Sequence, residues 1–218
     1  MKTPTEELAY VLARELLDLG AVSLSSQKPF TWASGLLSPV YCDNRMTLGF
    51  PAIRTRICEG FADLIESNNL DCDLIGGIAT AGIPHAAWLA DRLNKPMIYV
   101  RGEAKAHGRR NCIEGPMSAD SNVVLIEDLV STGRSSVAAI ESVEEAGGRV
   151  SAVLAIFTYG LERALHTFQE VGIPLHTLTD YPTLLEVARE SGEIDDDDAA
   201  SLRRWYEDPE AWSLERAN

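Results

Sequence analysis

Apolar residues recur along the chain with different periods in different segments. Near the N-terminus they follow a helical period, at Leu8, Val11, Leu12, Leu16 and Leu19. We therefore expect an amphipathic helix over residues 5–19, ended by Gly20. Residues 29–45 combine aromatic residues with Pro and Gly, which predicts short strands and turns. A second helix is expected over residues 51–67, because proline suits its first turn.

Beyond this point, short apolar runs alternate with helical patterns. The runs predict strands at residues 74–78, 97–100, 123–126, 150–157 and 175–178, and the helical patterns predict helices at 83–93, 134–146 and 161–171. This alternation predicts an α/β fold, in which helices flank a central parallel sheet. Ligands of such sheets bind beyond the carboxyl ends of the strands, so the loops at 79–82, 101–115 and 127–135 are the candidate sites.

The charge of the chain narrows the classes of ligand. The 218 residues include 19 Lys and Arg against 33 Asp and Glu, which gives a net charge of −14. Such a charge should repel nucleic acid from most of the surface. One basic cluster breaks the trend, and it contains Arg101, Lys105, His107, Arg109 and Arg110. It suggests an anionic ligand, although a charged surface loop without a ligand would give the same pattern.

Other features limit the setting of the protein. The chain has no run of about 18 apolar residues, so no membrane-spanning helix is expected. The four cysteines (Cys42, Cys58, Cys72 and Cys112) are scattered without a CxxC pair. This favours reduced thiols in a cytoplasmic protein and gives no reason to expect a zinc site.

Several single residues are expected to have structural roles. The run Asp195–Asp198 is expected to be a solvated turn before the last helix. His85 is expected to pack in the core, whereas His166 and His176 are expected to be exposed. Trp205 and Trp212 are expected to pack a terminal helix.

The strongest candidate for chemistry is the segment VVLIEDLVSTGRS, residues 123–135. An apolar strand leads into two carboxylates, Glu127 and Asp128, and then into a turn rich in Ser, Thr and Gly before a helix. Hydroxyl and backbone N–H groups at a helix N-terminus suit a phosphate. The carboxylates suit sugar hydroxyls or a developing positive charge. The segment therefore predicts a ligand with a phosphate at one end and a diol near its middle.

The same segment resembles the phosphoribosyl pyrophosphate (PRPP) signature of type I phosphoribosyltransferases. In that family the acidic pair contacts the ribose hydroxyls, and the following loop holds the 5′-phosphate. The resemblance places the ribose contacts on Glu127 and Asp128. It places the PRPP-binding loop on Leu129, Val130, Ser131, Thr132, Gly133, Arg134 and Ser135.

Further segments resemble one branch, the orotate phosphoribosyltransferases. RGEAKAHGRRNCIEG (101–115) resembles their catalytic loop, which places PRPP contacts on Arg101, Lys105 and His107. GGIATAGIPHAAWLADRL (76–93) resembles their pyrophosphate loop, with Ala79, Thr80, Ala81 and Gly82 at its turn. FTWASGLLSPVYCDNR (30–45) resembles the hood over orotate, and the resemblance also places Ser131 and Tyr159 against that base.

The resemblance implies a reaction and an assembly. Ribosyl phosphate would pass from PRPP to orotate, giving orotidine 5′-monophosphate and pyrophosphate, with catalysis carried by Lys105, His107, Glu127 and Asp128. Mg²⁺ is implied as a cofactor that enters with PRPP and not through a protein metal cluster. A homodimer with shared active sites is implied. The expected parts are a hood (1–50), an α/β PRPP-binding core (51–192) and an acidic helical tail (193–218) that packs on the core.

Departures from the family leave some points open. No basic residue lies between Lys28 and Arg45 in the hood, and Tyr159 stands where some members have Arg. The partner of the orotate carboxylate is therefore undecided. Arg134 stands where the family usually has Gly, and Gly102 or Glu103 replaces a second loop lysine. Two other functions remain: a phosphoribosyltransferase for another base, and a non-catalytic PRPP-sensing regulator that binds nucleic acid.

Overall fold

A computed structural model describes residues 3–32, 35–102 and 112–217. Lys105, His107 and the other predicted site residues of segment 103–111 lie outside the described residues. Internal contacts divide the chain into two compact units, one of residues 1–47 with 179–218 and one of residues 48–178. The parts expected from the sequence were instead bounded at residues 50 and 192. Among the described helices, none is long and apolar enough to span a bilayer.

Six strands form the central sheet, in the order β10-β9-β8-β5-β6-β7. The strands are β5 (Leu74–Ile78), β6 (Met97–Val100), β7 (Ile113–Glu114), β8 (Asn122–Val130), β9 (Arg149–Thr158) and β10 (Leu175–Asp180). β5 pairs in parallel with β6 and β8, and β8 pairs in parallel with β9. The short β7 pairs antiparallel to β6. The predicted α/β fold with a mostly parallel sheet is confirmed.

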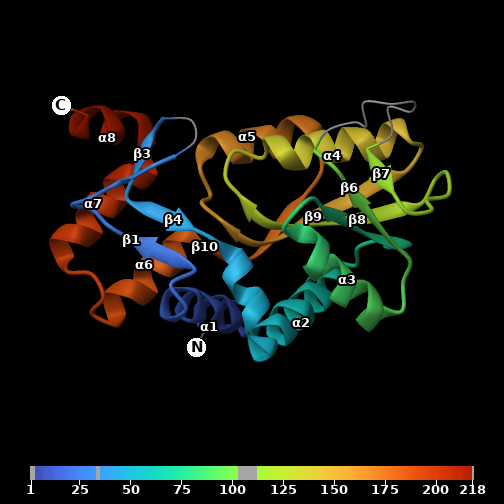
Figure 1. Cartoon of the computed structure of the whole chain (residues 1–218), viewed down its shortest axis with the longest axis horizontal. Coiled ribbons are helices and arrows are strands. Elements are labelled where there is room, and N and C mark those ends of the chain that lie inside the picture. The colour runs from blue at the N-terminus through green and yellow to red at the C-terminus, as the bar shows by residue number, and fades with distance from the viewer. Residues whose placement is uncertain (1–2, 33–34, 103–111, 218) are drawn as a thin grey trace. The chain divides into compact units, whose positions relative to one another are not determined.

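Four helices cover this sheet as two layers (Figure 1). They are α2 (Pro51–Ser67), α3 (Gly82–Leu93), α4 (Arg134–Glu145) and α5 (Glu162–Val171). α2 and α3 lie on one face, and α4 and α5 lie on the other. Because both faces are covered, all five residues of β5 are buried. This explains why the strands are continuous apolar runs and do not alternate with polar residues.

The other unit combines both ends of the chain. Its strands are β1 (Val22–Leu24), β2 (Phe30–Thr31), β3 (Leu37–Ser38) and β4 (Val40–Cys42), followed by the 3₁₀ helix η1 (Asn44–Gly49). Its helices are α1 (Pro4–Asp18), α6 (Tyr181–Glu190), α7 (Asp196–Glu207) and α8 (Pro209–Arg216). β1 pairs with β4 and β2 pairs with β3, both antiparallel. The short strands and turns expected over residues 29–45 are thus confirmed.

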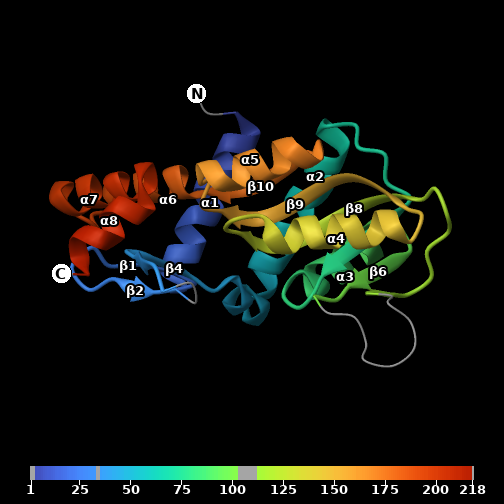
Figure 2. The same ribbon diagram turned by 90° about the horizontal axis from the view of Figure 1, so that it is seen from above.

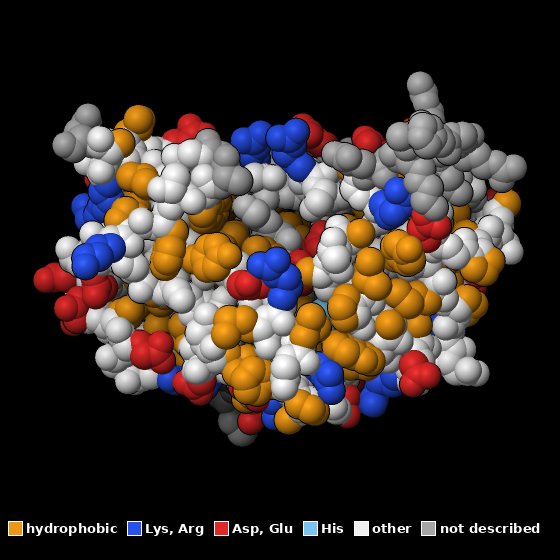
Figure 3. Space-filling view, in the orientation of Figure 1, with side chains coloured by type: hydrophobic (Ala, Val, Ile, Leu, Met, Phe, Trp, Pro, Cys, Tyr) orange, Lys and Arg blue, Asp and Glu red, His pale blue; other side chains and the backbone are white. Residues whose placement is uncertain are grey.

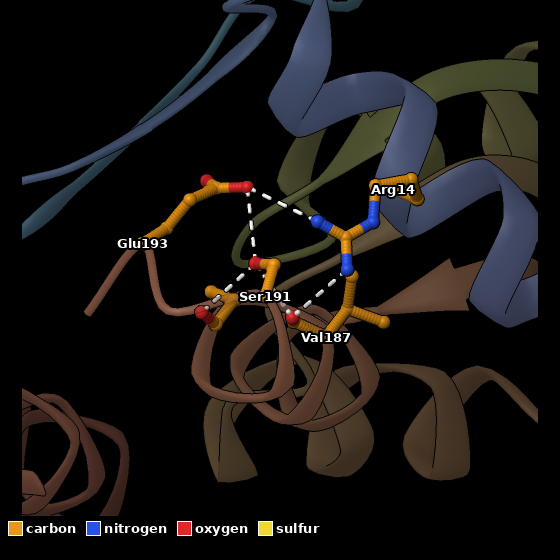
Figure 4. A network of polar contacts seen from close by, with 5 residues as sticks. Arg14, Val187, Ser191 and Glu193 are labelled. Carbon is orange, nitrogen blue, oxygen red and sulfur yellow. Dashed lines mark hydrogen bonds and ion pairs between the residues drawn. The ribbon is translucent and has the colours of Figure 1, made fainter. Parts of the chain in front are cut away.

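A polar network joins α1 to the end of α6 (Figure 4). The Arg14 guanidinium lies 3.3 Å from the Glu193 carboxylate and donates to the Val187 carbonyl at 3.4 Å. The Ser191 hydroxyl donates to the same carbonyl at 3.0 Å and to Glu193 at 3.2 Å. Arg14 therefore connects the first helix to a segment distant in the sequence, although a half-exposed ion pair contributes little stability by itself.

The acidic run of residues 195–198 begins a helix and does not form the predicted turn. Asp195 is the N-cap of α7, and its carboxylate accepts a hydrogen bond from the Asp198 N–H at 2.8 Å. Carboxylates suit this position because the N-terminus of a helix carries partial positive charge. The repeated Asp residues therefore serve as a helix start.

Trp205 is the largest fully buried side chain of the unit that contains the chain ends. Its ring makes edge contacts with Trp32, at 5.7 Å between centroids, and with Tyr181, at 5.1 Å. Trp212 is also buried, with 2% of its surface exposed. The prediction that both tryptophans pack terminal helices is confirmed.

We expect Trp205→Ala to lower the free energy of unfolding by about 3–5 kcal/mol, because it leaves a cavity between α7 and two aromatic neighbours. Chemical denaturation followed by circular dichroism would measure the change. Leu214→Ala is the control in the same unit, because Leu214 is 69% exposed. A similar loss in both variants would contradict the role given to Trp205.

Candidate functional site

The candidate site lies at the carboxyl edge of the sheet, where the three predicted loops follow β5 and β6 and include the end of β8. Glu127 and Asp128 do not follow the end of a strand, as the sequence suggested. β8 continues through both carboxylates to Val130, because Leu129 and Val130 stay in register with Phe157 and Thr158 of β9. The strand thus holds the acidic pair on a rigid frame.

Two glycines bring the predicted pyrophosphate loop close to this pair. A Cβ atom on Gly82 would lie 2.2 Å from the Ile126 carbonyl oxygen and 3.3 Å from the Glu127 Cα atom. A Cβ atom on Gly77 would lie 2.8 Å from the Ile83 Cα atom. Only glycine permits these contacts, so α3 begins directly against β5 and β8. The structure therefore places Gly82, the last residue of this loop, against the backbone of Ile126 and Glu127.

The predicted phosphate loop is a tight turn between β8 and α4. Gly133 is the N-cap of α4 with φ +80°, a conformation that residues with side chains rarely adopt. A Cβ atom there would also lie 3.1 Å from the Phe168 ring. No acidic residue occupies the first turn of α4. The helix N-terminus therefore keeps its partial positive charge, which favours an anion.

The two carboxyl groups have different environments. Glu127 is 6% exposed, and its carboxyl oxygens accept hydrogen bonds from the Asp128 N–H at 3.1 Å and the Ser135 hydroxyl at 3.3 Å. Burial, and secondly the adjacent Asp128 carboxylate, raise the pKa of Glu127 well above neutrality. Asp128 is half-buried. At neutral pH the protonated form of Glu127 is therefore favoured, and Asp128 is the more exposed member of the pair.

Arg101 stands at the end of β6, where the predicted catalytic loop begins. Its backbone N–H donates to the Cys112 carbonyl at 2.8 Å, and its guanidinium lies 3.1 Å from the Glu114 carboxylate. The ion pair brings together the two described ends of the loop. Glu114 was not singled out in the sequence, because nothing in its spacing relates it to Arg101.

Tyr159 follows β9 on the same edge of the sheet. It is 3% exposed, its N–H donates to the Val130 carbonyl at 3.2 Å, and its ring meets Phe157 edge-on at 5.4 Å. Thr158 was not predicted to contribute. Its hydroxyl donates to the Val130 carbonyl at 3.1 Å and accepts from the Gly160 N–H at 3.0 Å. These bonds fix the end of β8, from which Ser131 and the phosphate loop extend.

The histidines largely agree with expectation. His85, in the second turn of α3, is 2% exposed and meets Trp88 edge-on at 5.5 Å. Burial lowers the pKa of His85 to about 4, so the ring is neutral at neutral pH. His166 is exposed as predicted. His176 is half-buried instead of exposed, because it lies in β10, and burial lowers its pKa.

Comparison with known proteins places this arrangement in a family. Residues 51–176 match the family described as phosphoribosyl transferase domain. The curated orotate phosphoribosyltransferase of Cutibacterium acnes is 51% identical over 213 residues, covering 98% of this chain and 99% of its own length. That of Halalkalibacterium halodurans is 50% identical over 202 residues, covering 93% and 96%.

The solved structures agree. The crystal structure of orotate phosphoribosyltransferase from Aeropyrum pernix is 33% identical, with a TM-score of 0.72, and the match covers 84% of this chain and 99% of that one. The family match over residues 51–176 contains β5, β6 and β8, and also the helices α3 and α4 that begin at the candidate site. The chain therefore belongs to the phosphoribosyltransferase family and, within it, to the orotate phosphoribosyltransferases.

Proposed function

We propose that the chain transfers the ribosyl phosphate of PRPP to orotate, giving orotidine 5′-monophosphate and pyrophosphate for pyrimidine (UMP) synthesis. The observation that carries the proposal is the convergence of three predicted binding segments. The acidic pair, residues 79–82 and the turn at Ser131–Ser135 meet at one edge of the sheet. Membership of the orotate phosphoribosyltransferase family supports the choice of base.

In the proposed reaction the bond between ribose C1 and the pyrophosphate oxygen breaks, and a ring nitrogen of orotate bonds to C1. Positive charge develops on the sugar as the leaving group departs. Asp128 is the more exposed member of the acidic pair, and its carboxylate would stabilise that charge. The neutral Glu127 would exchange hydrogen bonds with a ribose hydroxyl. The N-terminus of α4 would hold the 5′-phosphate in place.

Mg²⁺ is part of the proposal. Within the described residues, no group of three or more His, Cys, Asp or Glu side chains could hold a metal ion. The hard oxygen donor at the site is the half-buried Asp128 carboxylate, which suits Mg²⁺ as a partial ligand beside substrate oxygens. When bound, the ion would offset the negative charge of the pyrophosphate. Lys105, His107 and Arg101 are proposed to supply further positive charge from the loop.

A homodimer with shared sites is also proposed. Hydrophobic side chains gather over α2 and α3 on the face shown in Figure 3. Phe50, directly before α2, is 44% exposed, and Trp88 on α3 is half-buried beneath the Arg54 guanidinium, 4.8 Å from the ring centroid. Exposed apolar surface of this kind favours association with a partner.

The proposed setting is the cytoplasm, with PRPP and orotate as ligands and without a nucleic acid or membrane partner. All four cysteines are free, which accords with a reducing compartment. The net charge of −14 disfavours binding to nucleic acid.

We expect orotate to be consumed in a Mg²⁺-dependent reaction with PRPP, far faster than uracil, adenine or hypoxanthine. Pyrophosphate release from a panel of these bases would measure the preference. A preference for a purine would reject orotate as the substrate while leaving PRPP chemistry intact. Release of no pyrophosphate with any base, together with salt-dependent binding of RNA or DNA, would favour the regulator instead.

The acidic pair gives a second test, because its two members differ in burial, and the protonated form is favoured for Glu127. We expect Asp128→Asn to lower kcat on the order of 10²-fold, since the lost charge acts mainly in the transition state. Glu127→Gln is the matched control, because an amide replaces a neutral carboxyl group of similar shape. It should lower kcat by less than about tenfold. Steady-state kinetics with PRPP would separate kcat from KM.

The opposite order of effects would contradict the proposal that Asp128 stabilises the transition state. If Asp128→Asn raised KM and left kcat unchanged, Asp128 would contribute only to binding of the ribose in the ground state.

Substitution of Lys105 would test whether each active site of the proposed dimer uses residues from both subunits. We expect Lys105→Ala to lower kcat more than it raises KM, because an ammonium on a loop opposes charge that builds on the leaving pyrophosphate. If Lys105 acts on the neighbouring site, mixing Lys105→Ala with Asp128→Asn restores activity. In a mixed dimer, one site then lacks both groups and the other lacks neither.

Random exchange should restore about a quarter of wild-type activity, since half of the dimers are mixed and each has one intact site of two. Exchange would be followed independently with subunits that carry two different affinity tags. No recovery after verified exchange would mean that Lys105 acts within its own chain.

A further inference from the structure

A cavity lies between α6 and α7, in the unit that contains both chain ends. Its volume is about 320 Å³, and it is lined by Tyr181, Pro182, Leu185, Glu186, Arg189, Arg203 and Tyr206. The residues of α6 are two adjacent pairs, 181–182 and 185–186, followed by Arg189, so each pair is four positions from the next, and the two residues of α7 are three positions apart. They therefore form one face of each helix. α6 and α7 pack against each other (Figure 2). The volume lies within the range of small-molecule sites, roughly 300–1,000 Å³.

Two arginines from different helices face this cavity. Arg189 and Arg203 are both exposed, and among the described residues neither forms an ion pair with a carboxylate. Other arginines of the chain do so, such as Arg14 with Glu193 at 3.3 Å and Arg149 with Asp120 at 3.0 Å. In a chain with 33 acidic residues, two guanidinium groups at one cavity without such a partner form a local positive site.

The nearby carboxylates have other partners. Glu186 lines the cavity, and its carboxylate lies close enough to the Tyr10 hydroxyl of α1 to help raise the pKa of that tyrosine, after the larger effect of burial. Asp180 is the N-cap of α6, where its carboxylate accepts a hydrogen bond from the Thr183 N–H at 2.9 Å. The local acidic groups therefore do not neutralise the two arginines by direct pairing.

An aromatic wall borders the arginines. The Tyr206 ring, half-buried on α7, lies 5.6 Å from the fully buried Tyr181 ring at an interplanar angle of 30°. Because Tyr181 is fixed in the core, Tyr206 is a supported surface beside the guanidinium groups. Such a surface can contact the sugar or ring portion of a ligand.

We propose that this cavity binds the phosphate group of a small phosphorylated molecule through Arg189 and Arg203. Guanidinium groups match phosphate oxygens in both charge and geometry, because each can donate two parallel hydrogen bonds. The remainder of the ligand would lie against Tyr206. Since one arginine comes from α6 and the other from α7, the ligand would connect the two helices. This site would be separate from the PRPP-binding loop, which lies in the other unit.

Isothermal titration with inorganic phosphate and with ribose 5-phosphate, at constant ionic strength, tests the proposal. The test variant is Arg189→Ala with Arg203→Ala. The control is Arg149→Ala with Arg163→Ala, which removes the same charge from two exposed positions outside the cavity. Binding at the active site contributes equally to both proteins, so their difference reports on the cavity alone.

We expect the test variant to bind one phosphate fewer per chain than the control, or to bind it at least about tenfold more weakly, which corresponds to a loss of 1.4 kcal/mol. Replacing both arginines with lysine should give an intermediate affinity, because lysine keeps the charge but not the paired hydrogen bonds. Equal stoichiometry and affinity in the test and control variants would overturn the proposal. Full affinity in the lysine variant would overturn the bidentate geometry.

Discussion

The close approach of α3 to β8 is the contact on which the candidate site depends. At Gly82 the two backbones are so near that a Cβ atom would lie 2.2 Å from the Ile126 carbonyl oxygen. Gly77 permits a similar approach between β5 and α3. These contacts bring the start of a helix, a loop and two carboxyl groups into one small volume. A side chain at either position would separate the loop from the acidic pair.

The same compactness determines the charge of the site. Close packing excludes water from Glu127, and a buried carboxyl group beside a second carboxylate holds its proton. The pair then carries one negative charge instead of two. This reduces its repulsion of a polyanionic substrate such as PRPP, while one charge is retained for the moment when the sugar becomes cationic. The burial that costs Glu127 its charge is therefore compatible with both substrate binding and transition-state stabilisation.

The sequence predicted most of the sheet because buried parallel strands are continuous apolar runs. The prediction ended β8 at Ile126, since polar side chains usually end such a run. In the structure, pairing of Leu129 and Val130 with β9 extends the strand through both carboxylates. The Glu114 partner of Arg101 and the bracing hydroxyl of Thr158 could not be predicted either, because both depend on neighbours distant in the sequence. The position of the phosphate loop could be predicted locally, because the sequence places Gly133 before α4, and glycine adopts its positive φ readily.

The division of the chain has a consequence for the order of folding during synthesis. Residues 48–178 form a continuous unit, so every strand pairing within it can form as soon as that segment has left the ribosome. The N-terminal helix α1 cannot form its main contacts so early, because they are made with α6. Its packing partner α6 begins at Tyr181, so α1 is made first but reaches its native contacts after the entire sheet unit has been translated. Throughout that interval α6 is not available to cover the apolar face of α1, which has Leu12 and Leu16 at its centre.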